Sequence, residues 1–267
     1  MSDAAVFLRD GDRIVPTELS QGPWNPQAQH GGAVAGLLMH LVEACEAPVP
    51  MRVARLSVDM LREVPLRPLG TRTRVVRTGK RIQLVDAVLH DGDAEVARAT
   101  ARQVRTERVA GLERWVSAPV PLGVPPEGHP PPEFRKGWRL PGYVRAMDFV
   151  RPGGPPSLGE VGVIWSRLRV PFLAGEETSP LVRLAAAADF ASGAGSPLDF
   201  ERFVSINPDL TIHVEREPRG EWVGVAGQTE LAVDGTGQSI GDLYDLEGRT
   251  GRAQASLYVA PRPPSGA

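Results

Sequence analysis

Cysteine is almost absent from the sequence, with Cys45 as its single representative. One cysteine cannot form an intramolecular disulfide, so a disulfide-stapled secreted domain is excluded and a reducing compartment is favoured. The sequence also lacks an apolar run long enough to cross a bilayer, and an N-terminal segment with a basic head and an apolar core. We therefore expect a cytoplasmic protein without a membrane partner.

An excess of one charge is missing as well. The chain carries 30 Lys and Arg against 32 Asp and Glu, a formal net charge of -2. This balance gives no reason to expect a basic face, and so no nucleic-acid partner. The length of 267 residues suits one large domain or two fused small ones.

Several common site patterns are not found. The five histidines show no spacing that would place two metal ligands on one face, and no phosphate-binding loop occurs, so we expect no metal and no cofactor. The residues 237–241 fit the G-x-S-x-G pattern of serine hydrolases. That mechanism needs a helix after the serine and a later histidine, whereas here a strand pattern continues and no histidine follows Ser239.

The last third of the sequence, from Phe203 to Val259, predicts antiparallel strands. Apolar and polar residues alternate with a period of two, and Gly, Pro and Asp-Gly turns separate four such runs. The segment just before it predicts a helix, with Ser179 as N-cap, Pro180 in the first position and a run of alanines. That helix ends in Asp189. A carboxylate on its buried side costs free energy unless it is paired or used, so Asp189 is either a solvent-facing cap or a catalytic acid.

A second helix is predicted after His30, Gly31 and Gly32, with apolar residues nearly all round it as in a buried helix. Backbone N–H groups at a helix start bind negative charge, which would suit an oxyanion. Alternatively, the two glycines only allow the helix to pack closely against its sheet, and His30 is an ordinary loop residue. The predicted strands around this helix and before the second one are 5–8, 13–15, 53–61, 70–78, 81–89, 95–106, 143–150 and 162–169.

The order of elements is the same on both sides of a Pro-rich stretch, which indicates an internal duplication. Locally, 55–59 aligns with 209–213, and 93–100 aligns with 247–254. We expect an N-terminal domain over 1–115, a linker over 116–136 and a C-terminal domain over 137–267. Each would be an α+β unit in which an antiparallel sheet wraps one long helix.

The chain resembles the acyl-CoA thioesterase II family, which has a double hotdog fold. The resemblance covers nearly the whole chain and is strongest at 29–32, 188–190, 204–213 and 251–254. It implies that Asp189, Ser205 and Gln254 hold the hydrolytic water, since they match the family's Asp, Ser or Thr, and Gln in type and order. Ala33 stands where the family usually has a Gln at the start of the first helix. In the first half, Thr100 occupies the position equivalent to Gln254 of the second half, so only one of the two duplicated sites would be complete.

The activity implied is hydrolysis of an acyl-CoA, or another acyl thioester, to a free acid and a thiol. An oriented carboxylate can act as general base on water, and we expect burial to raise the pKa of Asp189. A hotdog hydratase or dehydratase is an alternative, although such enzymes pair an acid with a histidine and we expect none near Asp189. A non-catalytic acyl-thioester-binding protein is a further alternative. Exposed sheet edges commonly pair with another chain, so the protein could form a homodimer.

Overall fold

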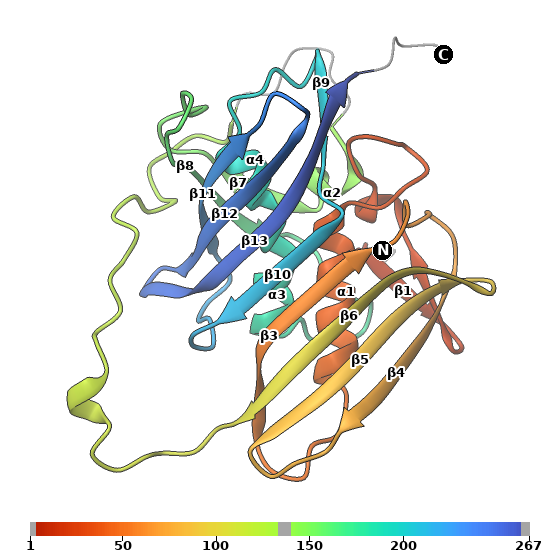
Figure 1. Ribbon diagram of the computed structural model, residues 1–267, viewed down its shortest axis with the longest axis vertical. Coiled ribbons are helices and arrows are strands. Elements are labelled where there is room, and N and C mark those ends of the chain that lie inside the picture. The colour runs from red at the N-terminus through yellow and green to blue at the C-terminus, as the bar shows by residue number, and fades with distance from the viewer. Residues whose placement is uncertain (1–3, 133–139, 263–267) are drawn as a thin grey trace.

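Two buried helices and the sheet that wraps them dominate this computed structural model, which describes residues 4–132 and 140–262 (Figure 1). The elements up to the linker are β1 (Phe7–Asp10), β2 (Arg13–Pro16), η1 (Glu18–Ser20), α1 (Gly31–Glu43), β3 (Met51–Met60), β4 (Leu69–Arg77), β5 (Ile82–Asp91) and β6 (Ala94–Arg105). Those that follow are η2 (Glu113–Trp115), α2 (Gly142–Arg145), β7 (Met147–Val150), β8 (Gly162–Leu168), α3 (Pro180–Ala188), α4 (Phe190–Ala194), β9 (Phe203–Ile206), β10 (Asp209–Val214), β11 (Val223–Leu231), β12 (Thr236–Asp245) and β13 (Gly248–Pro261).

The two long helices form as predicted and pack against each other. Ser179 is the N-cap of α3, where its Oγ accepts the Val182 N–H at 3.0 Å, and Pro180 occupies the first position. α1 is buried from Gly32 through Leu38 and beyond, as its nearly all-round apolar sequence predicts. Glu43, at the end of α1, accepts the Ser179 hydroxyl, so the helices run antiparallel.

The sheet has the symmetry that the duplication requires. Its strands run in the order β1-β2-β4-β5-β6-β3-β10-β13-β12-β11-β8-β7, so each half contributes a matching series that meets at β3 and β10. Ser57 lies opposite Thr211 at this seam, and these are equivalent positions in the predicted alignment. Within the halves, Ser57 pairs with Thr100 and Thr211 pairs with Gln254, which are again equivalent. The two halves therefore share one continuous antiparallel sheet.

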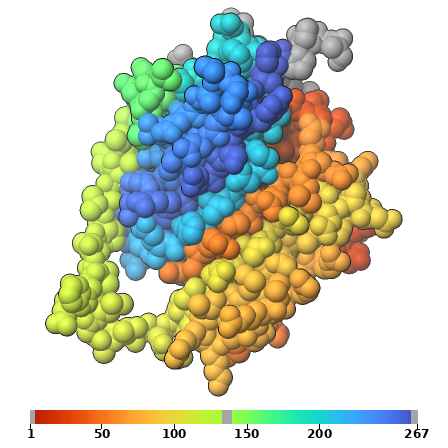
Figure 2. Space-filling view, in the orientation of Figure 1, coloured from red at the N-terminus to blue at the C-terminus, as the bar shows by residue number. Residues whose placement is uncertain are grey.

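The core is also continuous across the halves. Buried side chains of α1, α3 and the inner sheet faces form one cluster, with Leu56 on β3 and Ile212 on β10 paired across the seam. Figure 2 shows the outer face of the sheet, with the two halves in contact along a diagonal line. Within the described residues, no helix is long and apolar enough to span a bilayer.

The structure corrects two predicted elements. The strand predicted over 143–150 is instead the short helix α2 followed by β7, because a helical turn directs the wholly buried Tyr143 towards the helices. The last third contains five strands rather than four, since Pro208 separates β9 from β10. The residues 237–241 lie in strand β12, as predicted, with Ser239 buried.

The segment 107–132 contains no strand and only the helical turn η2. Its first part runs from β6 along an arc that stands clear of the main body in Figures 1 and 2, and its later part packs on the C-terminal half, where Trp165 Nε1 donates to the Val124 carbonyl at 2.6 Å. The linker predicted over 116–136 falls in this segment, except for 133–136, which lie outside the described residues together with 137–139. The division into domains at 115 and 137 remains our proposal.

Candidate active site

Asp189 lies between α3 and α4, where it is 7% exposed and surrounded by hydrogen-bond donors. Its Oδ2 accepts the Gly32 N–H at 2.9 Å, from the first turn of α1 in the other half of the chain. Its Oδ1 accepts from Asn207 Nδ2 at 2.5 Å, just after β9. The buried carboxylate is therefore paired on both oxygens, which excludes the solvent-facing reading of this residue.

His30 also contacts this carboxylate, and the expectation that no histidine lies near Asp189 is wrong. His30 Nδ1 lies 2.9 Å from Asp189 Oδ2, and the histidine side chain is 11% exposed. The imidazole stacks on Tyr143 with ring centroids 4.7 Å apart and lies against Phe190 at 5.2 Å. His30 is the N-cap of α1, so the same residue that begins one helix contacts the end of the other.

These contacts reverse the predicted direction of the Asp189 pKa shift. Burial by itself raises the pKa of this carboxyl, as we expected. The hydrogen bond and charge of His30 lower it, and so do the donors Asn207 and Gly32, and together they outweigh burial. The pKa of Asp189 is thus held below its usual value, and the side chain is an ionised carboxylate at neutral pH.

The two glycines are required by the closeness of the helices. A Cβ on Gly31 would lie 2.8 Å from Asp189 Oδ2, and a Cβ on Gly32 would lie 2.5 Å from the Ala186 carbonyl oxygen. Both glycines therefore allow close packing, although the partner is the other helix and the residue after it rather than the sheet. The Gly32 N–H is occupied by Asp189 and does not serve as a free oxyanion donor. The Gly31 N–H has no acceptor among the described residues, and Gly31 borders the cavity described below.

Ser205 is half-buried on β9 and borders the same cavity as Asp189. Asn207 lies two positions further along the chain and contacts the carboxylate directly. Sequence reasoning did not identify Asn207 or Tyr143 as site residues. The signal for Asn207 was weak but present, since residues two apart in an extended segment point to the same face.

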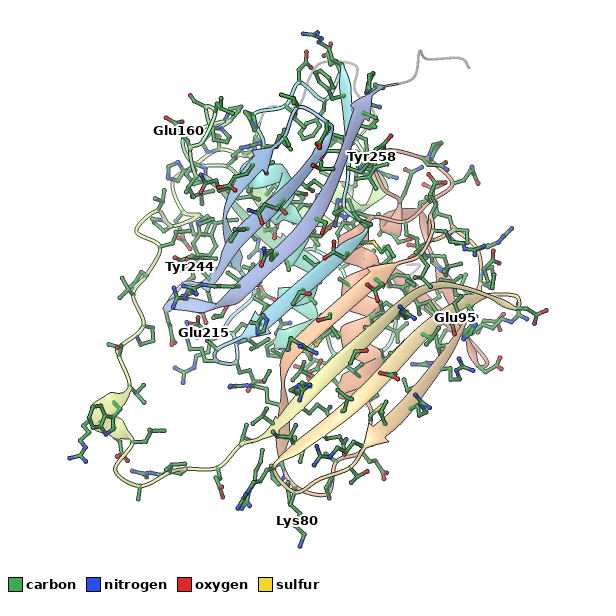
Figure 3. All side chains as sticks on the ribbon, viewed as in Figure 1. Lys80, Glu95, Glu160, Glu215, Tyr244 and Tyr258 are labelled. Atoms are coloured by element: carbon green, nitrogen blue, oxygen red, sulfur yellow. The ribbon has the colours of Figure 1, made fainter. Side chains whose placement is uncertain are left out.

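Gln254 does not join this group. Strand alternation on β13 buries Ala253 and Ala255 and leaves Gln254 exposed on the outer face, where its amide donates to Gln238 at 3.2 Å. The predicted set is thereby corrected, because Asp189, Ser205 and His30 meet at one cavity while Gln254 lies on the opposite side of the sheet. Tyr258, labelled in Figure 3, is further along β13 and pairs with Ile206 of β9.

The cavity that Asp189 borders has a volume of about 1450 Å³ and is lined from both halves and from the linker. Its walls are mainly apolar, as in most sites for organic ligands. The apolar lining side chains include Trp24, Met60, Val64, Val144, Phe149, Ile164, Phe190, Phe200 and Ile206. Three arginines also border it: Arg62, Arg151 and Arg262. Within the described parts of the chain, no group of three His, Cys, Asp or Glu could hold a metal ion.

Family comparisons agree with this architecture. The model of the acyl-CoA thioesterase N-terminal domain matches residues 20–104, and that of the acyl-CoA thioesterase C-terminal domain matches residues 126–251. The chain belongs to the acyl-CoA thioesterase II-like family. The site of this thioesterase-family chain thus draws its carboxylate from the C-terminal matched region and its histidine from the N-terminal one.

Solved structures show the same fold. A proposed thioesterase II from Thermobifida fusca superimposes with a TM-score of 0.71 at 17% identity, covering 95% of both chains. An acyl-CoA thioesterase II from Mycobacterium marinum gives 0.66 at 15% identity, covering 94% of this chain and 98% of that one. A hotdog-fold protein of unknown function from Alicyclobacillus acidocaldarius gives 0.71 at 16% identity, covering 98% and 97%. No curated protein matches the sequence significantly. This thioesterase-family chain therefore has the predicted tandem hotdog fold.

Proposed function

We propose that this protein hydrolyses acyl-CoA thioesters to a carboxylic acid and free CoA, in the cavity that Asp189 borders. The family supports acyl thioester hydrolysis in general. The observation that carries the proposal for this chain is the ionised Asp189, held by His30, Asn207 and the first turn of α1 at the wall of a large apolar cavity.

The chemistry suits a water molecule as nucleophile. A thioester carbonyl is electrophilic enough for direct attack, and no covalent intermediate with the protein is needed. The residues that line the cavity include Asp189, Ser205 and Gly31, which would provide a carboxylate, a hydroxyl and a backbone N–H to the reacting carbonyl and water. The N–H would stabilise the oxyanion, and removing one such donor costs about 3 kcal/mol in other enzymes.

The decisive experiment is free-thiol release from a panel of acyl-CoAs, short to long and branched to aromatic, with the purified protein. We expect clear release for one class and a fall of about 100-fold or more in kcat/KM for Asp189→Asn, as for loss of other groups that position a reacting water. The circular dichroism spectrum of the variant should be unchanged. Binding of a non-hydrolysable acyl-CoA without turnover of any thioester would instead support the non-catalytic binding protein.

The adenosine phosphates of CoA need cations, and Arg62 is the best placed of the cavity arginines to be free for them. Arg262 donates to the Phe200 carbonyl and Arg151 to three backbone carbonyls. The side chain of Arg62 is exposed and has no acceptor among the described residues. A free guanidinium suits the fork geometry of phosphate.

We therefore predict that Arg62→Gln raises KM for acyl-CoA about tenfold, as expected for loss of a contact of about 1.4 kcal/mol, with little change in kcat. The same acyl group on pantetheine, which lacks phosphates, should show no difference between the variant and the wild type. Arg77→Gln, at the far end of β4, is the matched control. An equal effect on both substrates would show that Arg62 does not contact the phosphates.

A second candidate is hydration or dehydration of an acyl thioester, because the pairing of His30 with Asp189 is the acid–histidine pair that such enzymes use. It predicts interconversion of a 2-enoyl and a 3-hydroxyacyl thioester without thiol release. Following the enoyl absorbance and free thiol in the same reaction separates the two activities.

A further inference from the structure

The protons at the His30–Asp189 contact determine what each group can do. Nδ1 and Oδ2 lie 2.9 Å apart, so without a proton between them two lone pairs would face each other. The Gly32 N–H points between the two atoms, 2.9 Å from Oδ2 and 3.0 Å from Nδ1. The carboxylate is the stronger acceptor of that N–H, since charged acceptors form the stronger hydrogen bonds. The proton of the imidazole is therefore on Nδ1, where it is donated to Asp189.

The other ring nitrogen, Nε2, belongs to a side chain that borders the cavity, since His30 is one of its lining residues. Nε2 has no hydrogen-bond partner among the described residues, and it is not among the polar atoms that are buried without one. In a neutral imidazole protonated on Nδ1, Nε2 is an acceptor. It is thus available to a water molecule in the cavity.

The ring is held in this orientation by its neighbours. It is stacked on Tyr143 and lies against Phe190, and the Tyr143 hydroxyl donates to the Ala186 carbonyl at 2.9 Å. Burial, followed by the charge of Asp189, raises the pKa of Tyr143 well above its usual value. Tyr143 therefore stays protonated, and its neutral ring restrains the orientation of the His30 imidazole.

The carboxylate has little capacity left to take a proton itself. Oδ1 accepts from Asn207, and Oδ2 accepts from Gly32 and His30. These donors lower the pKa of Asp189, which makes it a weaker base at neutral pH. The same arrangement makes it an effective support for an imidazole that becomes positively charged.

We propose that His30 is the general base and general acid of the reaction, and that Asp189 and Asn207 are positioning residues that act through it. This inference rests on the proposed thioester hydrolysis. Water oxygen attacks the acyl carbon while its proton passes to His30 Nε2, and a tetrahedral oxyanion forms. The C–S bond then breaks, the carbonyl is restored, and the leaving thiolate takes the proton from Nε2. His30 and Asp189 thereby return to their initial protonation states.

The charged surroundings of His30 define what else could titrate in a pH profile. Asp189 and Tyr143 contact the ring directly. The other titratable residues that line the cavity are Arg62, Glu63, His129, Arg151, Glu201 and Arg262.

The test is the pH profile of kcat/KM for wild type, His30→Asn, Asp189→Asn and His213→Gln. Asparagine is a good N-cap, so His30→Asn keeps the start of α1. We expect it to lower kcat/KM by about 100-fold or more and to abolish the acid limb of the profile. Asp189→Asn should lower kcat with little change in KM, because the imidazole loses the carboxylate that holds its Nδ1 proton. His213, exposed on β10, should have no effect when replaced.

A measurement independent of activity checks the same geometry. In wild-type protein labelled with ¹⁵N-histidine, the His30 ring, assigned by its absence in His30→Asn, should carry its proton on Nδ1. A proton on Nε2, or an active wild type whose rate and pH profile survive His30→Asn, would overturn the inference. A wild type that releases no thiol from any substrate would instead overturn the proposed function.

Discussion

At the scale of single residues, the site depends on how closely donors approach one carboxylate. Burial acts to raise the pKa of Asp189, and the contacts from His30, Asn207 and Gly32 prevail over it. The absence of a side chain at Gly31 is part of the same arrangement, because it leaves room for the carboxylate.

Gly31→Ala should lower kcat/KM by about 100-fold, since a displacement of about 1 Å is enough for such a loss. The new Cβ would lie 2.8 Å from Oδ2 and 2.9 Å from Oδ1 of Asp189, forcing the carboxylate or the helix to move. Gly70→Ala is the matched control, because its Cβ would meet only His90, with Cβ at 3.7 Å and the carbonyl oxygen at 3.9 Å, which are ordinary contacts. Steady-state kinetics of both variants decide it, and equal activities would show that the carboxylate has room to spare.

The stability of the protein should depend on pH through Asp189 in a definite direction. Its folded-state pKa is lowered from 3.8, so its contribution is fully present above the unfolded value and is lost as pH falls through the folded value. The free energy of unfolding of wild type minus that of Asp189→Asn should thus shrink on going from about pH 5 to about pH 3, around the usual aspartate range. Urea titrations measure it. A difference that grows on acidification would mean that burial dominates the pKa.

At the scale of elements, strand alternation decides which side chains reach the cavity. Gln254 has the residue type that the family resemblance asks for, yet its neighbours Ala253 and Ala255 occupy the inner face of β13. Asn207, between β9 and β10, contacts the Asp189 carboxylate, whereas Gln254 was expected to hold the water beside that carboxylate. A one-residue difference in register exchanges the two faces of a strand.

We accordingly predict that Gln254→Ala leaves kcat/KM within about twofold of wild type, as for most exposed substitutions. Asn207→Ala should lower it by about 10- to 100-fold, because Oδ1 of Asp189 loses its donor and a buried charge is left partly unpaired. The two variants are compared on the same substrate with thiol release as the readout. A larger loss for Gln254→Ala than for Asn207→Ala would show that Gln254 takes part in the reaction.

At the scale of the whole molecule, the two halves are packed into one body. They share the β3–β10 seam, a continuous core and the contact between α1 and α3. The site itself lies at this junction, since Asp189 comes from one half and His30 and Gly32 from the other. Loss of packing at the seam should therefore affect both halves together.

Leu56→Ala, at a fully buried position of the seam, should lower the free energy of unfolding by about 2–5 kcal/mol, as for other large-to-small core changes. Unfolding should stay a single transition when followed by tryptophan fluorescence and by far-UV circular dichroism. Leu8→Ala, at an exposed position of β1, is the control. Separate transitions for the two probes would show that the halves unfold independently.

The sequence by itself determined the local structure and the duplicated architecture. Ser179 and Pro180 mark the start of α3, the apolar surface of α1 predicts its burial, and alternating residues locate most strands, because these signals are carried by neighbours along the chain. The position of Asp189 at the end of the second long helix was also readable. Tyr143 was not, since a short buried helix and the start of a strand have the same apolar composition.

Only the tertiary structure decided the chemistry at Asp189. Gly32 and its carboxylate are 157 positions apart in the sequence, and His30 and Asn207 reach it from different elements. No local pattern encodes such a meeting, and the sign of the pKa shift depends on the sum of these contacts against burial. The sequence therefore located Asp189 at the end of its helix, whereas the packing of two antiparallel helices across the junction gave this carboxylate a histidine partner, and strand alternation left Gln254 on the outer face of the sheet.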